Sequence, residues 1–217
     1  MRKAYELLIF DWDGTLMDSA ERIVRSFQAA AHDCGWHALA DDAIRKTIGL
    51  GVAEALTQLL PGAAAARRQA IAARYREHFL HLNDTPTPLF PGVAAGLEDL
   101  RARGYKIAVA TGKSRIGLDA ALAASGTGGL FCATRCADET RSKPDPLMLH
   151  EILAETGVPA AQALMVGDTS YDIDMAARAG VDSVAVAYGV HDPADLHIHG
   201  PRLCVETFAE LCAWLPA

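Results

Sequence analysis

Four short apolar segments, each followed by polar residues, constrain the fold of this chain more than any other feature of its sequence. They cover residues 7–10, 106–110, 163–166 and 183–187. Short apolar runs without polar alternation are typical of strands that are buried on both faces, as in parallel sheets. Asp11, Thr111 and Asp168 each lie within two residues of the end of such a run. We therefore expect three polar side chains at one edge of a parallel sheet.

Helical patterns separate the apolar runs. They cover residues 93–103, 115–125, 146–156 and 172–179. Strands that alternate with helices predict an α/β fold in which helices cover both faces of a parallel sheet. Ligands of such sheets bind at the carboxyl ends of the strands, which is where the three polar residues fall.

Residues 16–87 interrupt this alternation with patterns that are helical only. The expected helices cover residues 19–34, 41–48, 51–60 and 63–82, and Asp41 is the expected N-cap of the second. The sequence therefore predicts two parts. Residues 1–15 and 88–217 form the α/β core, and residues 16–87 form an inserted helical domain.

Composition excludes several classes of function. The chain has 217 residues, 51% of them hydrophobic, and a net charge of −7. This acidic balance lacks the basic surface that nucleic-acid binding requires. No stretch approaches the roughly 20 apolar residues of a membrane span, and the short apolar run near the N-terminus is too short for a signal peptide. The five cysteines match no zinc spacing, so we expect reduced thiols and a cytoplasmic location.

Carboxylates concentrate after the first and third apolar runs. Asp11 and Asp13 stand two residues apart in the segment DWDGT, and Asp168 and Asp172 stand in the segment GDTSYD. Hard oxygen ligands of this kind suit Mg²⁺, which takes one or two carboxylates, waters and a phosphate oxygen. An acidic turn is the alternative for the first segment, and a favourable helix-dipole position is the alternative for Asp172.

Two further segments carry groups that bind anions. Thr111 and Gly112 precede a helix, where a hydroxyl and free backbone N–H groups can hold a phosphate; Ser114 is also a plausible N-cap there. Lys143 stands before two prolines at another helix entry, which fix the backbone that carries it. A surface position is the alternative for Lys143.

Together and in this order, the four segments resemble the signature motifs of the haloacid dehalogenase superfamily of hydrolases. DWDGT matches the first motif, Thr111 the second, Lys143 in KPDP the third, and GDTSYD the fourth. The resemblance spans nearly the whole chain. It implies a Rossmann-like core, and residues 16–87 correspond in position and helical character to the superfamily's C1 cap. Residues 48–51, IGLG, are similar to the cap loop of the phosphoglycolate phosphatase-like branch.

The resemblance implies a role for each matched residue. Asp11 attacks phosphorus and forms an aspartyl phosphate. Asp13 is the general acid and base. Thr111 and the Gly112 N–H bind the phosphoryl group, and Lys143 stabilises its charge and orients Asp11. Mg²⁺ is held by Asp11, Asp13 and Asp168, with Asp172 either a direct ligand or an outer one.

The expected substrate is a small phosphorylated metabolite, a phosphoglycolate-like or sugar phosphate. A phosphomutase of the β-phosphoglucomutase type, a pyrophosphatase and a non-catalytic family member are the alternatives. A phosphonatase is disfavoured by Asp13, and Lys46 is interpreted as a solvated helix residue. Arg45 is the first candidate for a substrate-specificity residue, ahead of Arg22, Arg25 and His78. Residues 191–199, with three histidines, are expected to form a surface loop. No pattern indicates an oligomeric state.

Overall fold

Six parallel strands form one sheet at the centre of the structure, a computed structural model in which residues 4–36 and 39–216 are described. The strand order is β3-β2-β1-β4-β5-β6. The strands are β1 (Leu7–Phe10), β2 (Lys106–Thr111), β3 (Ala133–Cys136), β4 (Ala163–Gly167), β5 (Asp182–Val186) and β6 (Leu203–Val205). All five pairings between neighbouring strands are parallel. The α/β fold and the four predicted strands are thus confirmed.

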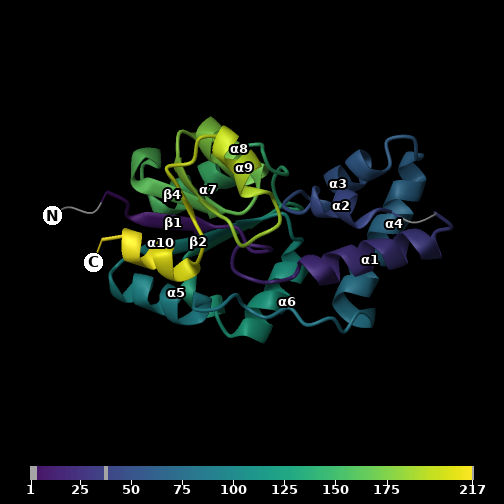
Figure 1. The fold of residues 1–217 in the computed structure, drawn as a ribbon, viewed down its shortest axis with the longest axis horizontal. Coiled ribbons are helices and arrows are strands. Elements are labelled where there is room, and N and C mark those ends of the chain that lie inside the picture. Colours follow the sequence, from purple (N-terminus) through teal and green to yellow (C-terminus); the bar gives the residue numbers. More distant parts are fainter. Residues whose placement is uncertain (1–3, 37–38, 217) are drawn as a thin grey trace.

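Helices cover both faces of the sheet because the side chains of each strand alternate between two hydrophobic layers (Figure 1). Leu8 and Phe10 pack with α5, α6 and α10, whereas Leu7 and Ile9 pack with α7 and α8. These helices are α5 (Val93–Ala102), α6 (Arg115–Ser125), α7 (Leu147–Thr156), α8 (Ser170–Ala179) and α10 (Phe208–Trp214). Shorter turns complete the core: η2 (Gly128–Leu130), η3 (Ala160–Gln162) and α9 (Pro193–Ile198).

The chain order places the switch point of the sheet between β1 and β4. The chain runs from β1 outward to β2 and β3, and then returns to the other side of β1 for β4, β5 and β6. The loops after β1 and β4 therefore leave the sheet in opposite directions, which opens a crevice at its carboxyl edge. Asp11 follows β1 and Asp168 follows β4, so both lie at this crevice.

A helical insertion, defined here as residues 20–82, lies beyond this edge of the sheet and has a hydrophobic core of its own (Figure 1). It comprises α1 (Ala20–Asp33), α2 (Asp41–Arg45), α3 (Val52–Leu59), α4 (Ala65–Glu77) and the π-helix η1 (His78–Leu82). Phe27 and Tyr75 stack within its core, with ring centroids 4.1 Å apart. The predicted domain boundaries at residues 15/16 and 87/88 stay a prediction.

Three details of the predicted elements are wrong. Asp41 is the first residue of α2 and Ala40 is its N-cap, so Asp41 contributes its charge to the first turn. The helix expected over 63–82 changes from α to π at His78. The expected loop at 191–199 contains α9, because Asp192 caps the backbone N–H of Ala194 and Pro193 occupies the first helical turn. No helix of the described residues is long and apolar enough to cross a membrane.

Candidate active site

Asp11 occupies the centre of the crevice. Its backbone N–H donates to the Val166 carbonyl at 2.9 Å, which fixes the residue beside the end of β4. Its side chain is only 1% exposed. Burial therefore raises the pKa of Asp11 well above its ordinary value, and the Lys143 ammonium opposes that shift. A buried carboxylate with this environment needs a cation to stay ionised.

Lys143 supplies one such cation from beneath the site. Its Nζ lies 2.7 Å from Asp11 Oδ1 and 2.6 Å from Asp172 Oδ1. Burial alone would lower the pKa of Lys143, but the two carboxylates raise it above its ordinary value. Lys143 is therefore a buried ammonium ion, and the alternative of a surface lysine is wrong.

Asp168 is held by groups from two loops. Thr15 Oγ1 donates to Asp168 Oδ1 and the Val190 N–H donates to Asp168 Oδ2, both at 2.9 Å. Burial, followed by the charge of Asp172, raises the pKa of Asp168 to about 7. Gly14, at φ +82°, passes so close that a Cβ there would lie 2.1 Å from Asp168 Oδ2. Only glycine permits this approach.

Asp172 uses both of its oxygens within the protein. Oδ1 contacts Lys143, and Oδ2 accepts from the Thr169 N–H at 3.2 Å and from Thr169 Oγ1 at 2.7 Å. The contact with the Thr169 N–H is part of a capping box at the start of α8. The helix-start interpretation of Asp172 is thus correct, and its oxygens already take part in three contacts.

The three buried carboxylates form a group that could hold a metal ion. Oxygens of Asp11, Asp168 and Asp172 lie within 4.8 Å of one another. Asp11 Oδ2 is buried without a hydrogen-bond partner in the described part of the chain. When all three carboxylates are ionised, their three negative charges face one ammonium ion, which leaves the group with a net charge of −2. An oxygen-rich site with this charge and an unsatisfied buried oxygen fits Mg²⁺.

Asp13 lines the pocket together with Asp11. Its Oδ1 accepts from Ser19 Oγ, and Lys113 Nζ lies 2.8 Å from the same oxygen. Asp13 thus contacts the open pocket, whereas Asp168 and Asp172 are fully buried. Sequence analysis did not find the partner of Asp13, because Lys113 lies 100 residues further along the chain.

Thr111 and Gly112 lie at the end of β2. Thr111 is buried, and its Oγ1 accepts from the Lys113 N–H at 3.2 Å. A Cβ on Gly112 would lie 2.5 Å from the Leu50 carbonyl oxygen, so the backbone of the helical insertion packs directly against this glycine. Ser114 caps α6, as predicted, by accepting from the Gly117 N–H at 3.3 Å.

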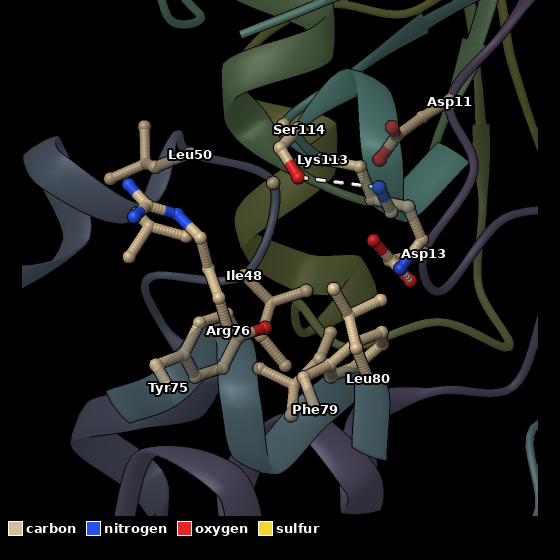
Figure 2. Close-up of a pocket in the computed structure, with 15 residues that line it drawn as sticks. Asp11, Asp13, Ile48, Leu50, Tyr75, Arg76, Phe79, Leu80, Lys113 and Ser114 are labelled. Carbon is tan, nitrogen blue, oxygen red and sulfur yellow. Dashed lines mark hydrogen bonds and ion pairs between the residues drawn. The ribbon is translucent and has the colours of Figure 1, made fainter. Parts of the chain in front are cut away.

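A pocket of about 50 Å³ lies between the core and the helical insertion. Figure 2 shows Asp11 and Asp13 on one side and Leu50, Tyr75 and Phe79 on the other. The lining residues are Asp11, Asp13, Ile23, Ile48, Gly49, Leu50, Val52, Tyr75, Arg76, Phe79, Leu80, Gly112, Lys113, Ser114 and Gly117. This volume holds only a few water molecules, so the insertion must move to admit a larger ligand.

The role of Arg45 as a substrate-specificity residue stays a prediction. Arg45 lies outside the lining of this pocket and pairs with Glu21, its Nη2 3.0 Å from Glu21 Oε2. The cations of the pocket are instead Arg76 and Lys113. The signal for Lys113 was present, because it directly follows Thr111 and Gly112. The π-helical turn that brings Phe79 and Leu80 into the lining carries no such signal.

Comparisons with known proteins agree with this geometry. The family model for haloacid dehalogenase-like hydrolases matches residues 8–186. The chain is 37% identical to the "Probable phosphatase IndB" of Dickeya dadantii, over 94% of this chain and 91% of that protein. It is 30% identical to a phosphoglycolate phosphatase of Colwellia psychrerythraea, over 95% of each. The fold is similar to the crystal structure of a predicted phosphoglycolate phosphatase from Haemophilus somnus, with a TM-score of 0.86, 24% identity and 97% of both chains covered.

Proposed function

The chain belongs to the haloacid dehalogenase-like hydrolase family and is a phosphatase, and we propose that it hydrolyses a small phosphate monoester with Mg²⁺ through an aspartyl phosphate on Asp11. The observation that carries this proposal is the position of Asp11. Its carboxylate contacts Lys143, shares a group with Asp168 and Asp172, and lines the pocket. Positioning and charge neutralisation are what phosphoryl transfer requires.

In the first step, the Asp11 carboxylate attacks phosphorus while the bond from phosphorus to the ester oxygen breaks. Asp13 gives its proton to the departing alkoxide. Thr111 and the Gly112 N–H bind the phosphoryl oxygens at the end of β2. Lys143 remains against Asp11 and offsets part of the charge that collects there.

In the second step, water attacks the phosphorus of the aspartyl phosphate. Asp13, now ionised, takes the proton of that water, and the bond from phosphorus to the Asp11 oxygen breaks. Inorganic phosphate and the free Asp11 carboxylate result. The contact of Asp13 with the open pocket, rather than with the buried group, suits a residue that exchanges protons with both alcohol and water.

Asp11, Asp168 and the backbone carbonyl of Asp13 would hold Mg²⁺, with Asp172 beside them and held by Thr169 and Lys143. The ion would neutralise charge on the transferring phosphoryl group. The unpartnered Asp11 Oδ2 and the net charge of −2 on the ionised group support this assignment.

The helical insertion would act as a cap. Gly51 N–H donates to Ser142 Oγ at 2.8 Å, and Tyr171 Oη donates to the Lys46 carbonyl at 2.9 Å. Together with the packing of the Leu50 backbone against Gly112, these contacts hold the cap closed over Asp11. A closed cap excludes water from the reacting groups, and its side chains contact the leaving alcohol.

A phosphate-release assay tests the proposal. The protein with Mg²⁺ is offered a panel of phosphorylated metabolites that includes phosphoglycolate, hexose phosphates and pyrophosphate. We expect release from a small monoester and loss of that release on addition of EDTA. Transfer of labelled phosphate to a second hydroxyl would indicate the phosphomutase alternative, and selective cleavage of pyrophosphate would indicate the pyrophosphatase alternative. No release from any compound by the folded protein would contradict the proposal.

We further infer a small-molecule partner and a cytoplasmic location. The pocket is small and lies between the core and the cap, as suits a metabolite rather than a macromolecule. The five cysteines are all free thiols, which is the usual state in a reducing compartment. Fractionation of cells of the source organism would test the location.

A further inference from the structure

A second lysine, Lys113, lines the active-site pocket. Lys143 is fully buried beneath Asp11 and does not line the pocket. Lys113 does line it, although its own side chain is also mostly enclosed, with the residue only 8% exposed. The phosphoryl chemistry described above uses Lys143 and leaves Lys113 without a role.

The Lys113 ammonium has two partners in the closed protein. Its Nζ lies 2.8 Å from Asp13 Oδ1 and 4.3 Å from the centroid of the Phe79 ring, which comes from η1 of the cap. An ammonium ion has three donors, and a carboxylate oxygen occupies one of them. The ring face attracts the charge but leaves room for a further hydrogen bond. Lys113 can therefore donate a hydrogen bond to an additional anionic partner inside the pocket.

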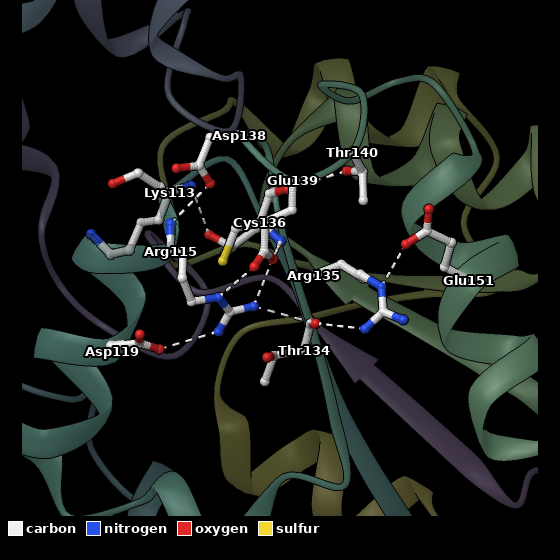
Figure 3. Close-up of polar contacts among 12 residues, drawn as sticks. Lys113, Arg115, Asp119, Thr134, Arg135, Cys136, Asp138, Glu139, Thr140 and Glu151 are labelled. Carbon is white, nitrogen blue, oxygen red and sulfur yellow. Dashed lines mark hydrogen bonds and ion pairs between the residues drawn. The ribbon is translucent and has the colours of Figure 1, made fainter.

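The backbone that carries Lys113 is anchored firmly. The Ala137 N–H donates to the Lys113 carbonyl at 3.1 Å. Two residues on, Arg115 binds both oxygens of Glu139, with Nε to Oε1 at 2.9 Å and Nη2 to Oε2 at 2.7 Å (Figure 3). This bidentate pair fixes the start of α6 to the loop after β3. The ammonium is thus presented at a defined position, as recognition requires.

Apart from Tyr75 and Arg76, the cap side of the pocket is apolar. Its apolar side chains are those of Ile23, Ile48, Leu50, Val52, Phe79 and Leu80. A leaving alcohol with several hydroxyls would lose hydrogen bonds to water there without replacement. A compact alcohol with one charged group loses little, provided that this group reaches the ammonium. Because Lys113 Nζ contacts the proposed proton donor Asp13, that group must lie only a few bonds from the ester oxygen.

We propose that Lys113, held between Asp13 and Phe79, is the specificity-determining residue of this phosphatase. It selects esters whose leaving alcohol carries a carboxylate close to the ester oxygen. This inference rests on the proposed function. In the empty pocket the ammonium is neutralised by Asp13 alone, and the substrate carboxylate becomes its second anionic partner when the cap closes. Arg45, outside the pocket, has no part in this selection.

The test compares two substrates of nearly equal size, phosphoglycolate and its neutral primary amide. For the wild type we expect kcat/KM to favour the carboxylate about 10- to 100-fold, the usual effect of one enclosed charged hydrogen bond. In Lys113→Met the ratio should fall to near 1, mainly through loss of the carboxylate substrate. Lys113→Arg, which keeps the charge, should restore most of the preference. Arg45→Met is the matched control and should keep the wild-type ratio.

An unchanged ratio of kcat/KM values in Lys113→Met would overturn the inference, whether activity on both substrates is kept or falls equally. Equal losses would show that Lys113 acts only through Asp13 or the fold. Product inhibition of the wild type gives a check that needs no variant. Glycolate should inhibit more strongly than glycolamide, and equal inhibition would contradict the inference. Absence of phosphate release from both esters in the wild type would instead count against the proposed function itself.

Discussion

Lys143 Nζ lies 2.7 Å from Asp11 Oδ1, and both side chains are almost completely removed from water. The pair is further bound to Asp172, so two carboxylates share one ammonium ion. An ion pair of this kind contributes mainly by keeping each partner charged and oriented. The relationship explains how a carboxylate whose pKa is raised by burial can still be ionised, as the proposed nucleophilic role of Asp11 requires.

Replacement of Lys143 tests this dependence. In Lys143→Met, Asp11 and Asp172 would remain buried without their ammonium partner, which typically costs about 3–5 kcal/mol. We expect urea unfolding to show a loss of that size and phosphate release to be undetectable. Arg141→Met is the control, because its pair with Asp145 is exposed and contributes about 0–1 kcal/mol. Equal stability of the two variants would contradict the account.

The raised pKa of Asp168 predicts that Mg²⁺ affinity depends on pH. Burial and Asp172 raise the pKa of Asp168 to about 7, so below this pH the carboxyl holds a proton that the ion must displace. Affinity should therefore rise with pH, by about tenfold between pH 6 and pH 8, and level off above. Isothermal titration calorimetry at these pH values measures it. An affinity that is the same at pH 6 and pH 8 would be inconsistent with the prediction.

Gly14 and Gly92 offer a matched pair of backbone positions. Their φ angles are +82° and +81°. A Cβ on Gly14 would lie 2.1 Å from Asp168 Oδ2, whereas a Cβ on Gly92 would have no neighbour within 4 Å. Both Gly→Ala variants should lose about 1–2 kcal/mol of stability from the φ angle alone. Only Gly14→Ala should also lose Mg²⁺ binding and turnover, as calorimetry and phosphate release would show. Normal Mg²⁺ binding in Gly14→Ala would refute the proposed role of the close approach.

Gly112 tests the seating of the cap. In Gly112→Ala the added Cβ would lie 2.5 Å from the Leu50 carbonyl oxygen, and the cap could close only by moving away from the core. We expect kcat/KM for phosphate release to fall about tenfold or more, because misplaced cap groups lose their hold on the substrate. Mg²⁺ affinity should be unchanged, since the atoms nearest to a Cβ on Gly112 belong to Leu50 and Gly49 and not to the buried carboxylates. Parallel loss of Mg²⁺ affinity would point to a different cause.

The sequence was most informative where burial is complete. The strands β1, β2, β4 and β5 are almost wholly buried, so their side chains form apolar runs that predict them. The strands β3 and β6 are the two edge strands of the sheet. Both are short and only partly buried, and neither was predicted. Arg135, in the middle of β3, binds Glu151 outside the core and conceals the strand pattern.

The proposed catalytic carboxylates were predictable because they stand in short sequence motifs. Their electrostatic partners were harder to predict. The contact of Lys113 with Asp13 joins residues 100 positions apart, and the contact with Phe79 depends on a π-helical turn that hydrophobic periodicity does not distinguish from α-helix. The ion pair of Arg45 was not predictable for the same reason, because its partner Glu21 lies on another helix.

The most direct test of the central claim is to trap the covalent intermediate. The protein is mixed with Mg²⁺ and an excess of a substrate found in the panel, quenched within milliseconds and reduced with borohydride, and its peptides are analysed by mass spectrometry. The account predicts that residue 11 alone carries the reduced product, a homoserine, and that Asp11→Asn gives none and releases no phosphate. Modification at another carboxylate, or full turnover by Asp11→Asn, would contradict it.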